Sequence, residues 1–499
     1  MNCSLLLMVT VFMAPGWPNV RVDHQNLPTH ICHNCAIAVG PGAPSSPPLY
    51  VVFQDDSCTM GVRADIWFQK STDAGRTWLA EDLLIRRGNR YACYPDITTD
   101  SDGNVFIIYL EADTAGADRV FCVHSSDGGT TWSLPAEVDD SLDATIGGAK
   151  IAADSAGNLL CAWNDWRTGS SHIWSSVSTD GGATWGRNVQ VDDDTTNYDC
   201  YPRDAFVQPG TNHYLVAVGA PRWFGGHIIP CAFLYRSTDR GQTFQPGVQL
   251  DTFNWAAWTP HVVADRDHII CDYFGSTGFS SPLFAESRTF YTQRDTWGAP
   301  HSVTNLDSLH ELYLSGPLAL SGDGRVHTAL IVTDTINWCY HVYYTSSSDH
   351  GVSWTDLELV DEDTTLSSGY PDIGADSSGH AYVVWPHGEA GQPRIWFATN
   401  NPQAVAEQPA QYPIGAQPSA TVVRGVLVLD GLGTRSELPE RNSVMSRATL
   451  LDISGRKVMD LHPGANDVRA LAPGVYFVEE GLGTRGQGLG RIRKVVVTR

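Results

Sequence analysis

The chain has 499 residues, of which 42% are hydrophobic and 10% aromatic, and it carries a formal net charge of −23. This length and apolar content allow a large buried core and exclude a disordered chain. The acidic balance also excludes nucleic acid as a partner, because phosphate backbones bind basic surfaces.

The chain begins with an apolar stretch from Leu5 to Ala14, followed by small residues. It is too short to span a bilayer and has no basic residues before it, but it is typical of an export signal. No other stretch is apolar enough to cross a membrane. We therefore predict a signal peptide over residues 1–16 and no transmembrane segment.

An octapeptide pattern, Ser-x-Asp-x-Gly-x-(Ser/Thr)-(Trp/Phe), occurs five times. The copies are Ser71–Trp78, Ser125–Trp132, Ser178–Trp185, Ser237–Phe244 and Ser347–Trp354. Their aspartates are separated by 54, 53, 59 and 110 residues, and a degenerate copy at Thr292–Trp297 fills the double gap. A fixed period of this size indicates stacked repeats of one supersecondary unit.

The octapeptide has the composition of a tight turn. Ser and Asp side chains accept backbone N–H bonds, Gly supplies a positive φ, and the aromatic ring buries apolar surface. The alternative is a ring of carboxylates for metal binding or acid chemistry, but turn geometry explains every fixed position. The residues expected to be structural are Asp73, Gly75, Trp78, Asp127, Gly129, Trp132, Asp180, Gly182, Trp185, Asp239, Gly241, Phe244, Asp349, Gly351 and Trp354.

Each repeat also holds segments rich in β-branched and aromatic residues. Tyr94–Tyr109 reads as two strands joined by a Gly-containing turn, Asp65–Lys70 as a third strand and Asn188–Asp192 as a fourth. Four antiparallel strands per repeat describe a propeller blade. Seven such repeats predict an all-β, seven-bladed β-propeller over residues 17–399; six blades and an irregular module are the alternative.

The seventh repeat has a third strand, Arg394–Ala398, but no octapeptide and no fourth strand after it. The segment Trp17–Asp23 resembles the fourth-strand segment Trp185–Asp192. We therefore expect the N-terminal strand to complete the last blade and close the ring, which removes the open sheet edges.

Metal and cofactor sites are weakly indicated. Cys32 and Cys35 resemble half of a zinc site, but a local disulfide or simple packing is the preferred interpretation. The acidic loops Asp192–Asp194 and Asp361–Asp363 offer oxygen ligands for Ca²⁺, although solvation explains them as well. We assign no metal site and no cofactor, with Ca²⁺ kept as an alternative.

After a Pro- and Gln-rich linker at residues 400–419, short strands and Pro-Gly turns over residues 420–499 predict a small β-sandwich. The segments Ala448–Lys457, Leu471–Val478 and Arg493–Arg499 resemble the C-terminal sorting domain of the bacterial type IX secretion system. The resemblance implies that the type IX machinery is a partner. It also implies passage through the periplasm to the outer-membrane surface or the medium.

The octapeptides resemble the Asp boxes, or BNR repeats, of the sialidase-like superfamily, where they are structural turns. That family grips the sugar carboxylate with three arginines and uses a Tyr nucleophile, a Glu and an Asp. The segment that normally carries the first arginine has no counterpart here, and Arg21 and Arg63 fit it poorly. No catalytic residue is therefore carried over, and the catalytic residues stay unassigned.

A ligand site is expected on the loops that join strand four to strand one and strand two to strand three. The candidate ligand-binding residues are Asp96, Arg203, Asp204, Trp223, His261, Glu311 and Asp372. Their mixture of carboxylates, cations and aromatic rings suits polar sugars. For the recurring aspartates, Asp96 and Asp372, a structural blade-to-blade role is the preferred alternative.

Three functions compete. The leading one is an exported propeller that recognises glycan or protein ligands, such as extracellular glycans or glycoproteins, at its loop-bearing face and carries out no reaction. The second is an exo-sialidase or another glycoside hydrolase, which needs paired carboxylates or an arginine triad on the loop-bearing face. The third is a structural or adhesive surface protein, for which we expect a flat, filled mouth.

Overall fold

In the computed structural model the chain divides into two compact units, Met1–Glu407 and Gln408–Arg499. The structure describes residues 17–402 without 25–30, 44, 57–63, 89–90, 113–117, 142–145, 194–197, 225–226, 252–255, 277–282, 305, 307–309, 315, 335–337, 364–365 and 389–391. Further on it describes residues 421–423, 426–429, 447–451, 456–461, 464–467, 471, 474–481 and 491–497. The expected signal peptide lies outside the described residues, as does nearly all of the expected linker.

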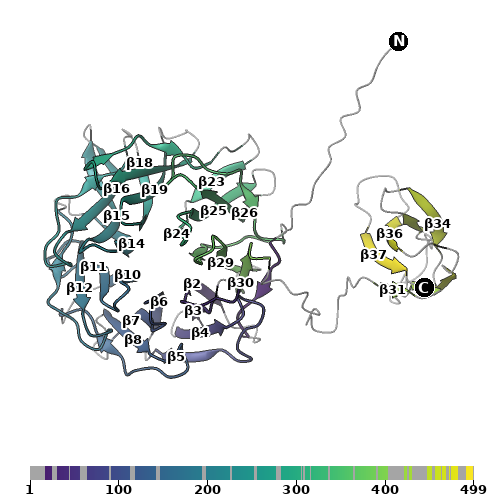
Figure 1. Ribbon diagram of the computed structural model, residues 1–499, viewed down its shortest axis with the longest axis horizontal. Helices are drawn as coiled ribbons and strands as arrows, with labels where there is room; N and C mark the ends of the chain where they lie inside the picture. Colours follow the sequence, from purple (N-terminus) through teal and green to yellow (C-terminus); the bar gives the residue numbers. More distant parts are fainter. Residues whose placement is uncertain are drawn as a thin grey trace, which may run out of the picture. The chain divides into compact units, whose positions relative to one another are not determined.

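The first unit is a ring of seven antiparallel sheets (Figure 1). Blade 1 has β2 (Cys32–Val39), β3 (Leu49–Asp55), β4 (Asp65–Ser71) and β5 (Leu83–Arg87), and blade 2 has β6 (Ala92–Thr99), β7 (Val105–Ala112), β8 (Asp118–Ser125) and β9 (Ala136–Glu137). Blade 3 has β10 (Ile146–Ala153), β11 (Leu159–Asp165), β12 (His172–Ser178) and β13 (Val189–Gln190), and blade 4 has β14 (Tyr201–Val207), β15 (Tyr214–Phe224), β16 (His227–Ser237) and β17 (Val248–Gln249). The prediction of seven blades rather than six is confirmed.

The remaining blades vary the same plan. Blade 5 has β18 (Ala256–Ala264), β19 (His268–Ser276), β20 (Phe284–Tyr291), β21 (Thr296–Trp297) and β22 (His301–Ser302). Blade 6 has β23 (His310–Leu314), β24 (Leu318–Leu320), β25 (Val326–Asp334), β26 (Cys339–Ser347) and β27 (Glu358–Leu359). Blade 7 has β28 (Asp372–Ala375), β29 (Ala381–His387), β30 (Arg394–Thr399) and, from the other end of the chain, β1 (Val20–Arg21).

The ring is closed by the N-terminal strand. Val20 and Arg21 of β1 pair with Phe397 and Trp396 of β30. Beyond them the Val22 amide donates to the Ile395 carbonyl at 2.8 Å. The expected closure is therefore present, and all seven sheets are held about one axis.

The core lies between neighbouring blades. Every residue of β3, β7, β11 and β29, the second strands of their blades, is buried. A sheet that is covered on both faces needs near-continuous apolar strands, which explains the Val-, Ile- and Phe-rich segments. Cys122, Cys161 and Cys271 are buried within β8, β11 and β19, so packing accounts for these three thiols.

The five octapeptides form identical turns between the third and fourth strands. In the first, the amide of Gly75 donates to the Ser71 hydroxyl at 2.8 Å, and the amide of Thr77 donates to Asp73 at 2.9 Å. Gly75 has a φ of 92°. The same bonds recur in the other four copies. The aspartate side chains therefore accept hydrogen bonds within their own turns, as the sequence predicted.

Each turn also contacts the preceding blade. The Trp132 ring packs edge-on against Phe68 of blade 1, with centroids 5.1 Å apart, and Trp78 packs in the same way on Phe397 of blade 7. These rings are half-buried rather than enclosed. The octapeptide thus joins neighbouring blades as well as closing its own hairpin.

The second unit contains a five-stranded and a two-stranded sheet. The larger has the order β31 (Thr421–Val423), β37 (Arg491–Val497), β36 (Gly474–Gly481), β33 (Arg447–Leu451) and β34 (Lys457–Leu461), with β31 parallel to β37. The smaller pairs β32 (Val426–Leu429) with β35 (Gly464–Asp467). Two sheets agree with the expected sandwich. Across the described parts of the chain, we find no helix with the length and hydropathy of a membrane span.

Substituting the turn glycine should weaken the contact between blades. Gly129 has a φ of 82°, and a Cβ there would lie 2.5 Å from Phe68 Cζ. Gly129→Ala should therefore lower the free energy of unfolding by about 3 kcal/mol, from left-handed strain and overpacking together. Gly128→Ala is the matched control, because its added Cβ meets no atom nearer than 3.2 Å. It should cost about 1 kcal/mol. Equal losses in denaturant unfolding would contradict the proposed contact.

Candidate functional site

One register position of the inner strand faces the axis in every blade. It lies four residues before the residue that opens the turn between the first and second strands. Around the ring this position is held by Ala36, Asp96, Lys150, Asp204, His261, Pro317 and Asp372. Five of the seven side chains are ionisable, and the blades bring them to one level of the channel because their registers agree.

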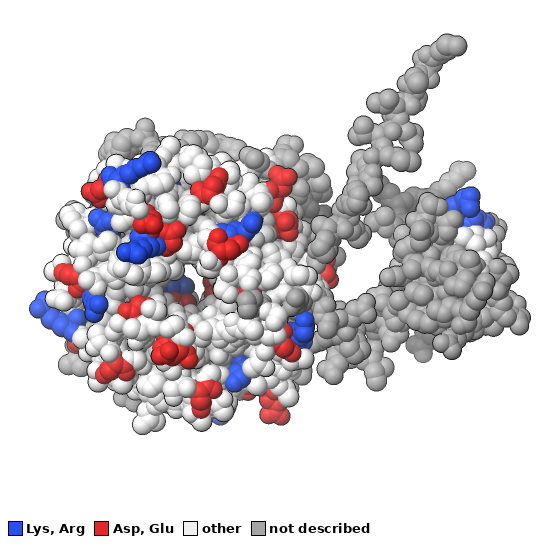
Figure 2. All heavy atoms as spheres, viewed as in Figure 1, with Lys and Arg blue, Asp and Glu red and all other residues white. Residues whose placement is uncertain are grey.

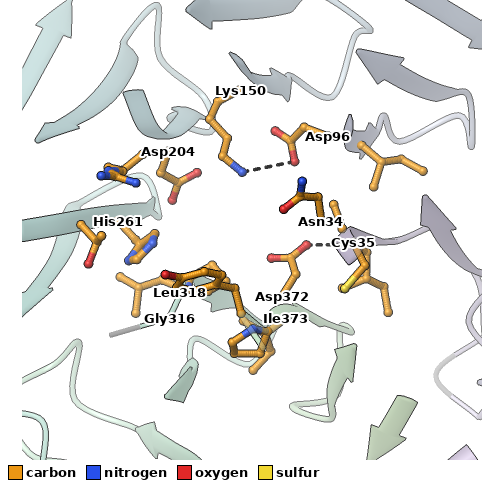
Figure 3. A pocket seen from close by; sticks show the side chains of 18 of the residues that line it. Asn34, Cys35, Asp96, Lys150, Asp204, His261, Gly316, Leu318, Asp372 and Ile373 are labelled. Carbon is orange, nitrogen blue, oxygen red and sulfur yellow. Dashed lines mark hydrogen bonds and ion pairs between the residues drawn. The ribbon is translucent and has the colours of Figure 1, made fainter. Parts of the chain in front are cut away.

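These seven residues line a cavity of about 960 Å³ along the axis. Figure 2 shows the hollow at the centre of the propeller, with acidic and basic atoms inside it. In Figure 3 Asp96, Lys150, Asp204, His261 and Asp372 surround this space and come from different blades. The cavity is large enough for a small oligosaccharide or a peptide segment.

Each of the three aspartates also bridges to the next blade. Asp96 Oδ2 accepts the Ile151 amide at 2.9 Å, and Asp204 Oδ2 accepts the Val262 amide at 2.9 Å. Asp372 Oδ2 accepts the Ile37 amide at 2.7 Å, across the closure of the ring. The blade-to-blade role is therefore real, and it fixes the orientation of the carboxylates that face the cavity.

The charges in the channel are strongly coupled. Lys150 Nζ lies 3.7 Å from Asp96 Oδ1, and the two side chains are 36% and 13% exposed. Burial opposes the charge on Lys150, yet the carboxylates of Asp96, Asp372 and Asp204 raise its pKa. A lysine held charged among carboxylates is a fixed cation at the centre of the ring.

Two of the carboxyls have raised pKa values. Burial raises the pKa of Asp204 to about 7 and that of Asp372 to about 6, and the nearby charge of Asp96 raises both pKa values further. At neutral pH Asp204 is thus divided between a hydrogen-bond donor and an acceptor form.

Arg203 and His261 complete the polar lining. Burial lowers the pKa of Arg203, and its guanidinium carbon lies 5.3 Å from the centre of the Tyr201 ring. Within the described part of the protein, Arg203 Nε is buried without a hydrogen-bond partner. His261 Nδ1 lies 3.1 Å from Asp272 Oδ1, which fixes the ring and leaves Nε2 for other contacts. An unpaired guanidinium nitrogen beside a cavity favours a polar ligand.

Aromatic rings surround the start of the inner strands. Tyr94, Tyr313 and Tyr370 line the cavity and are 49%, 43% and 61% exposed. Trp258 also lines it. Tyr94 has a φ of 51°, so its backbone is in the left-handed region at a bulge of β6. Strained backbone beside a cavity is typical of binding sites.

Two predicted residues lie elsewhere. Trp223, near the end of the long strand β15, is 62% exposed and is not part of the cavity lining. Glu311 of β23 is also exposed and outside the lining, although its neighbour Tyr313 belongs to it. The structure therefore brings together Asp96, Arg203, Asp204, His261 and Asp372, but neither of these two.

Tyr94 and Tyr370 were not among the predicted residues. Tyr94 and Tyr370 each stand two places before a recurring aspartate, in the sequence Tyr-Pro-Asp-Ile. A strand that carries a bulge at that point changes which face its side chains take. The repeated Tyr-Pro-Asp-Ile segment could have pointed to these tyrosines from the sequence. The exposure of their rings could not be read from the sequence.

The carboxylates considered for Ca²⁺ have protein partners. Asp192 is bonded to His172 and the Ile173 amide, and Asp361 accepts from the Ser368 hydroxyl at 2.6 Å. Asp194 lies outside the described residues. These bonds give the buried aspartates of both loops a structural use.

The raised carboxyl pKa values make stability depend on pH. A carboxyl with a raised pKa in the folded state binds protons more tightly there, so folding is favoured as pH falls through that pKa. Asp204, with a pKa of about 7, should make the melting temperature rise between pH 8 and pH 6. Asp204→Asn should flatten this slope.

Below about pH 4 the trend should reverse. The turn aspartates Asp73, Asp180, Asp239 and Asp349 have lowered pKa values, and the stability they contribute is lost as they are protonated. Differential scanning calorimetry at each pH measures both limbs. If the melting temperature of Asp204→Asn still rises between pH 8 and pH 6 as it does in the native protein, groups other than Asp204 cause that rise.

Comparison with known proteins gives a family match for part of the chain. Residues 49–257 match the BNR repeat-like domain. No curated protein matches the chain. Among solved structures, a protein of unknown function from Dyadobacter fermentans DSM 18053 is similar, with 14% identity and a TM-score of 0.46 over 77% of this chain and 99% of the other.

Two further solved structures are enzymes. The Hadza microbial sialidase Hz136 has 14% identity and a TM-score of 0.45, over 73% of this chain and 75% of its own. An α-L-arabinanase from Penicillium chrysogenum has 15% identity and a TM-score of 0.44, over 76% and 97%. Identities this low do not transfer an activity. Residues 49–257 are therefore similar to the BNR repeat-like domain, and the structure builds them into part of a seven-bladed β-propeller.

Proposed function

We propose that the protein is an exported propeller that binds glycans at the mouth of its axial cavity. The observation that carries the proposal is the ring of Asp96, Lys150, Asp204, His261 and Asp372 beneath exposed tyrosines. Sugars present hydroxyl groups around their edges and apolar faces above and below. The cavity offers a partner for each of these surfaces.

The polar groups can bind sugar hydroxyls in both directions. Carboxylate oxygens that remain after the blade-to-blade bonds accept hydrogen bonds, and Lys150 donates them. Asp204 can do either near neutral pH, because its pKa is about 7. The Tyr94 and Tyr370 rings supply surfaces on which a sugar face can stack.

Glycoside hydrolysis is the second candidate, favoured by one observation. Asp204 and Asp372 have raised pKa values, and Lys150 Nζ lies 3.7 Å from Asp96 Oδ1. Carboxyls of unequal pKa are what acid–base cleavage of a glycosidic bond needs. Against it, each aspartate already bonds a backbone amide of the next blade.

Sialidase chemistry has less support than other hydrolysis. Among the described residues that line the cavity, Arg203 is the single arginine. The triad of arginines that would bind a sugar carboxylate therefore has at most one member in this lining. The open cavity also counts against a purely adhesive protein, for which a filled mouth is expected.

Export is part of the proposal. It is supported by the apolar segment at residues 1–16 and by the type IX-like sequence pattern over residues 420–499. On this proposal the type IX machinery is a partner and the propeller works in the medium or at the cell surface. An acidic, strongly charged surface suits a protein that must stay soluble there.

The cavity proposal predicts loss of glycan binding on substitution of its lining. On a glycan array, Lys150→Met and Tyr370→Ala should each weaken the bound signal by about tenfold or more, through loss of a charged donor or a stacking ring. Leu134→Ala is the control, because Leu134 is 88% exposed and outside the cavity lining. Loss of signal in the control as well would contradict the assignment to the cavity.

The same proteins distinguish the two functions. Hydrolysis of a fluorogenic glycoside by the native protein, abolished by Asp204→Asn, would establish the enzyme instead of the pure receptor. Absence of both binding and hydrolysis across the array would refute both.

Removal of residues 420–499 should stop delivery to the surface. The truncated protein should accumulate in the periplasm with its propeller folded, because the two units are separate compact bodies. Cell fractionation followed by limited proteolysis measures both location and folding. Normal surface delivery of the truncated protein would refute the sorting role.

A further inference from the structure

A second cluster of ligand-type side chains lies at the other ends of the inner strands, where the Asp-box turns are. Asp265 opens the turn between β18 and β19, His268 begins β19, and His350 is the fourth residue of the Asp box in blade 6. Their ligand atoms all lie within 4.8 Å of one another. The cluster therefore joins blade 5 to blade 6.

The distances within the cluster suit one small ion. His268 Nδ1 lies 3.1 Å from Asp265 Oδ2, and His350 Nε2 lies 3.2 Å from the same oxygen. Ligands bound tetrahedrally at about 2.0–2.2 Å from Zn²⁺ are separated by about 3.3–3.6 Å. The two imidazoles stack with centroids 3.9 Å apart, so their edges must turn slightly apart to share an ion.

The types of ligand atom in the cluster indicate which metal ions it would bind. Two imidazole nitrogens and one carboxylate oxygen suit Zn²⁺ and similar transition ions, whereas Ca²⁺ and Mg²⁺ prefer oxygen ligands throughout. The three side chains are 23–31% exposed, so an ion can enter and a water molecule can fill the fourth position.

The neighbouring bonds hold the ligands in place. Asp265 Oδ1 accepts the amides of Asp267 and His268, each at 2.7 Å, which orients the carboxylate. The hydroxyl of Thr289 in blade 5 donates to the His350 carbonyl, and that of Ser287 donates to the Gly351 carbonyl at 2.6 Å. These bonds fix the carboxylate of Asp265 and the backbone of His350.

Comparison with the other blades shows which contacts of the cluster also occur elsewhere in the propeller. In blade 7, His380 Nδ1 lies 2.9 Å from Asp376 Oδ2, so a turn with an Asp–His pair is not special to blade 5. The Asp box that packs on blade 7 has Ala74 where blade 6 has His350, with φ values of 61° and 60°. Within the described residues, only the pair in blade 5 gains a third ligand.

We propose that Asp265, His268 and His350 form a Zn²⁺ site that ties blade 5 to blade 6. The site is separate from the cavity and does not depend on the function proposed for it. Binding of the ion replaces the His–Asp contacts by metal–ligand bonds and leaves one coordination position to water.

The test is Zn²⁺ titration of the full-length, metal-free protein by isothermal calorimetry. We expect a bound equivalent in the native protein whose affinity falls by about 100-fold or more in His350→Ala. This variant should fold, because alanine already occupies the position in the first Asp box. His268→Asn is the second variant, since Asn104 pairs with Asp100 in the turn of blade 2.

His380→Ala is the matched control, because it removes a similar partly exposed His that pairs with a turn Asp, without touching the cluster. It should bind Zn²⁺ as the native protein does, and Ca²⁺ in excess should not displace the ion. Zn²⁺ should also raise the melting temperature of the native protein and the control but not of His350→Ala. No bound equivalent in the native protein, or equal affinity in His350→Ala, would overturn the proposal.

Discussion

The pairing of β1 with β30 is the constraint on which the rest of the propeller depends. Two strands from opposite ends of the first unit share a sheet, so the outer edge of β30 is paired and the last blade is tied to the beginning of the ring. Closure also sets the last gap, where Asp372 of blade 7 accepts the Ile37 amide of blade 1. Because every blade must meet its neighbours at the same spacing, one register position is repeated around a common axis.

That repeated position serves structure and chemistry together. The aspartates at 96, 204 and 372 each bridge to the next blade with one oxygen, while their carboxyl groups still line the cavity. Burial raises the pKa values of Asp204 and Asp372, and the neighbouring carboxylates raise that of Lys150. A ligand site can therefore arise from bonds that the fold needs in any case.

At the opposite ends of the inner strands, structural contacts and a proposed ligand site again involve the same residues. The Asp box closes a hairpin and packs on the preceding blade, and in blade 6 its fourth residue lies against the turn of blade 5. Three of the five copies have a small residue at this position, Ala74, Gly128 and Gly181. In blade 6 the residue is His350, and an ordinary turn acquires a third metal ligand.

The sequence alone determined the repeat, the number of blades, the role of the octapeptides and the closing strand, because these depend on local turn chemistry and on a fixed period. It also indicated Asp96, Arg203, Asp204, His261 and Asp372, which follow from the register of the inner strands. It could not separate these from Trp223 and Glu311, because loop and strand-end positions vary between blades. Only the tertiary structure decided the exposure of Tyr94 and Tyr370, the coupled charges around Lys150 and the meeting of His350 with Asp265. Those contacts join residues far apart in the chain, and their geometry is set by packing between blades.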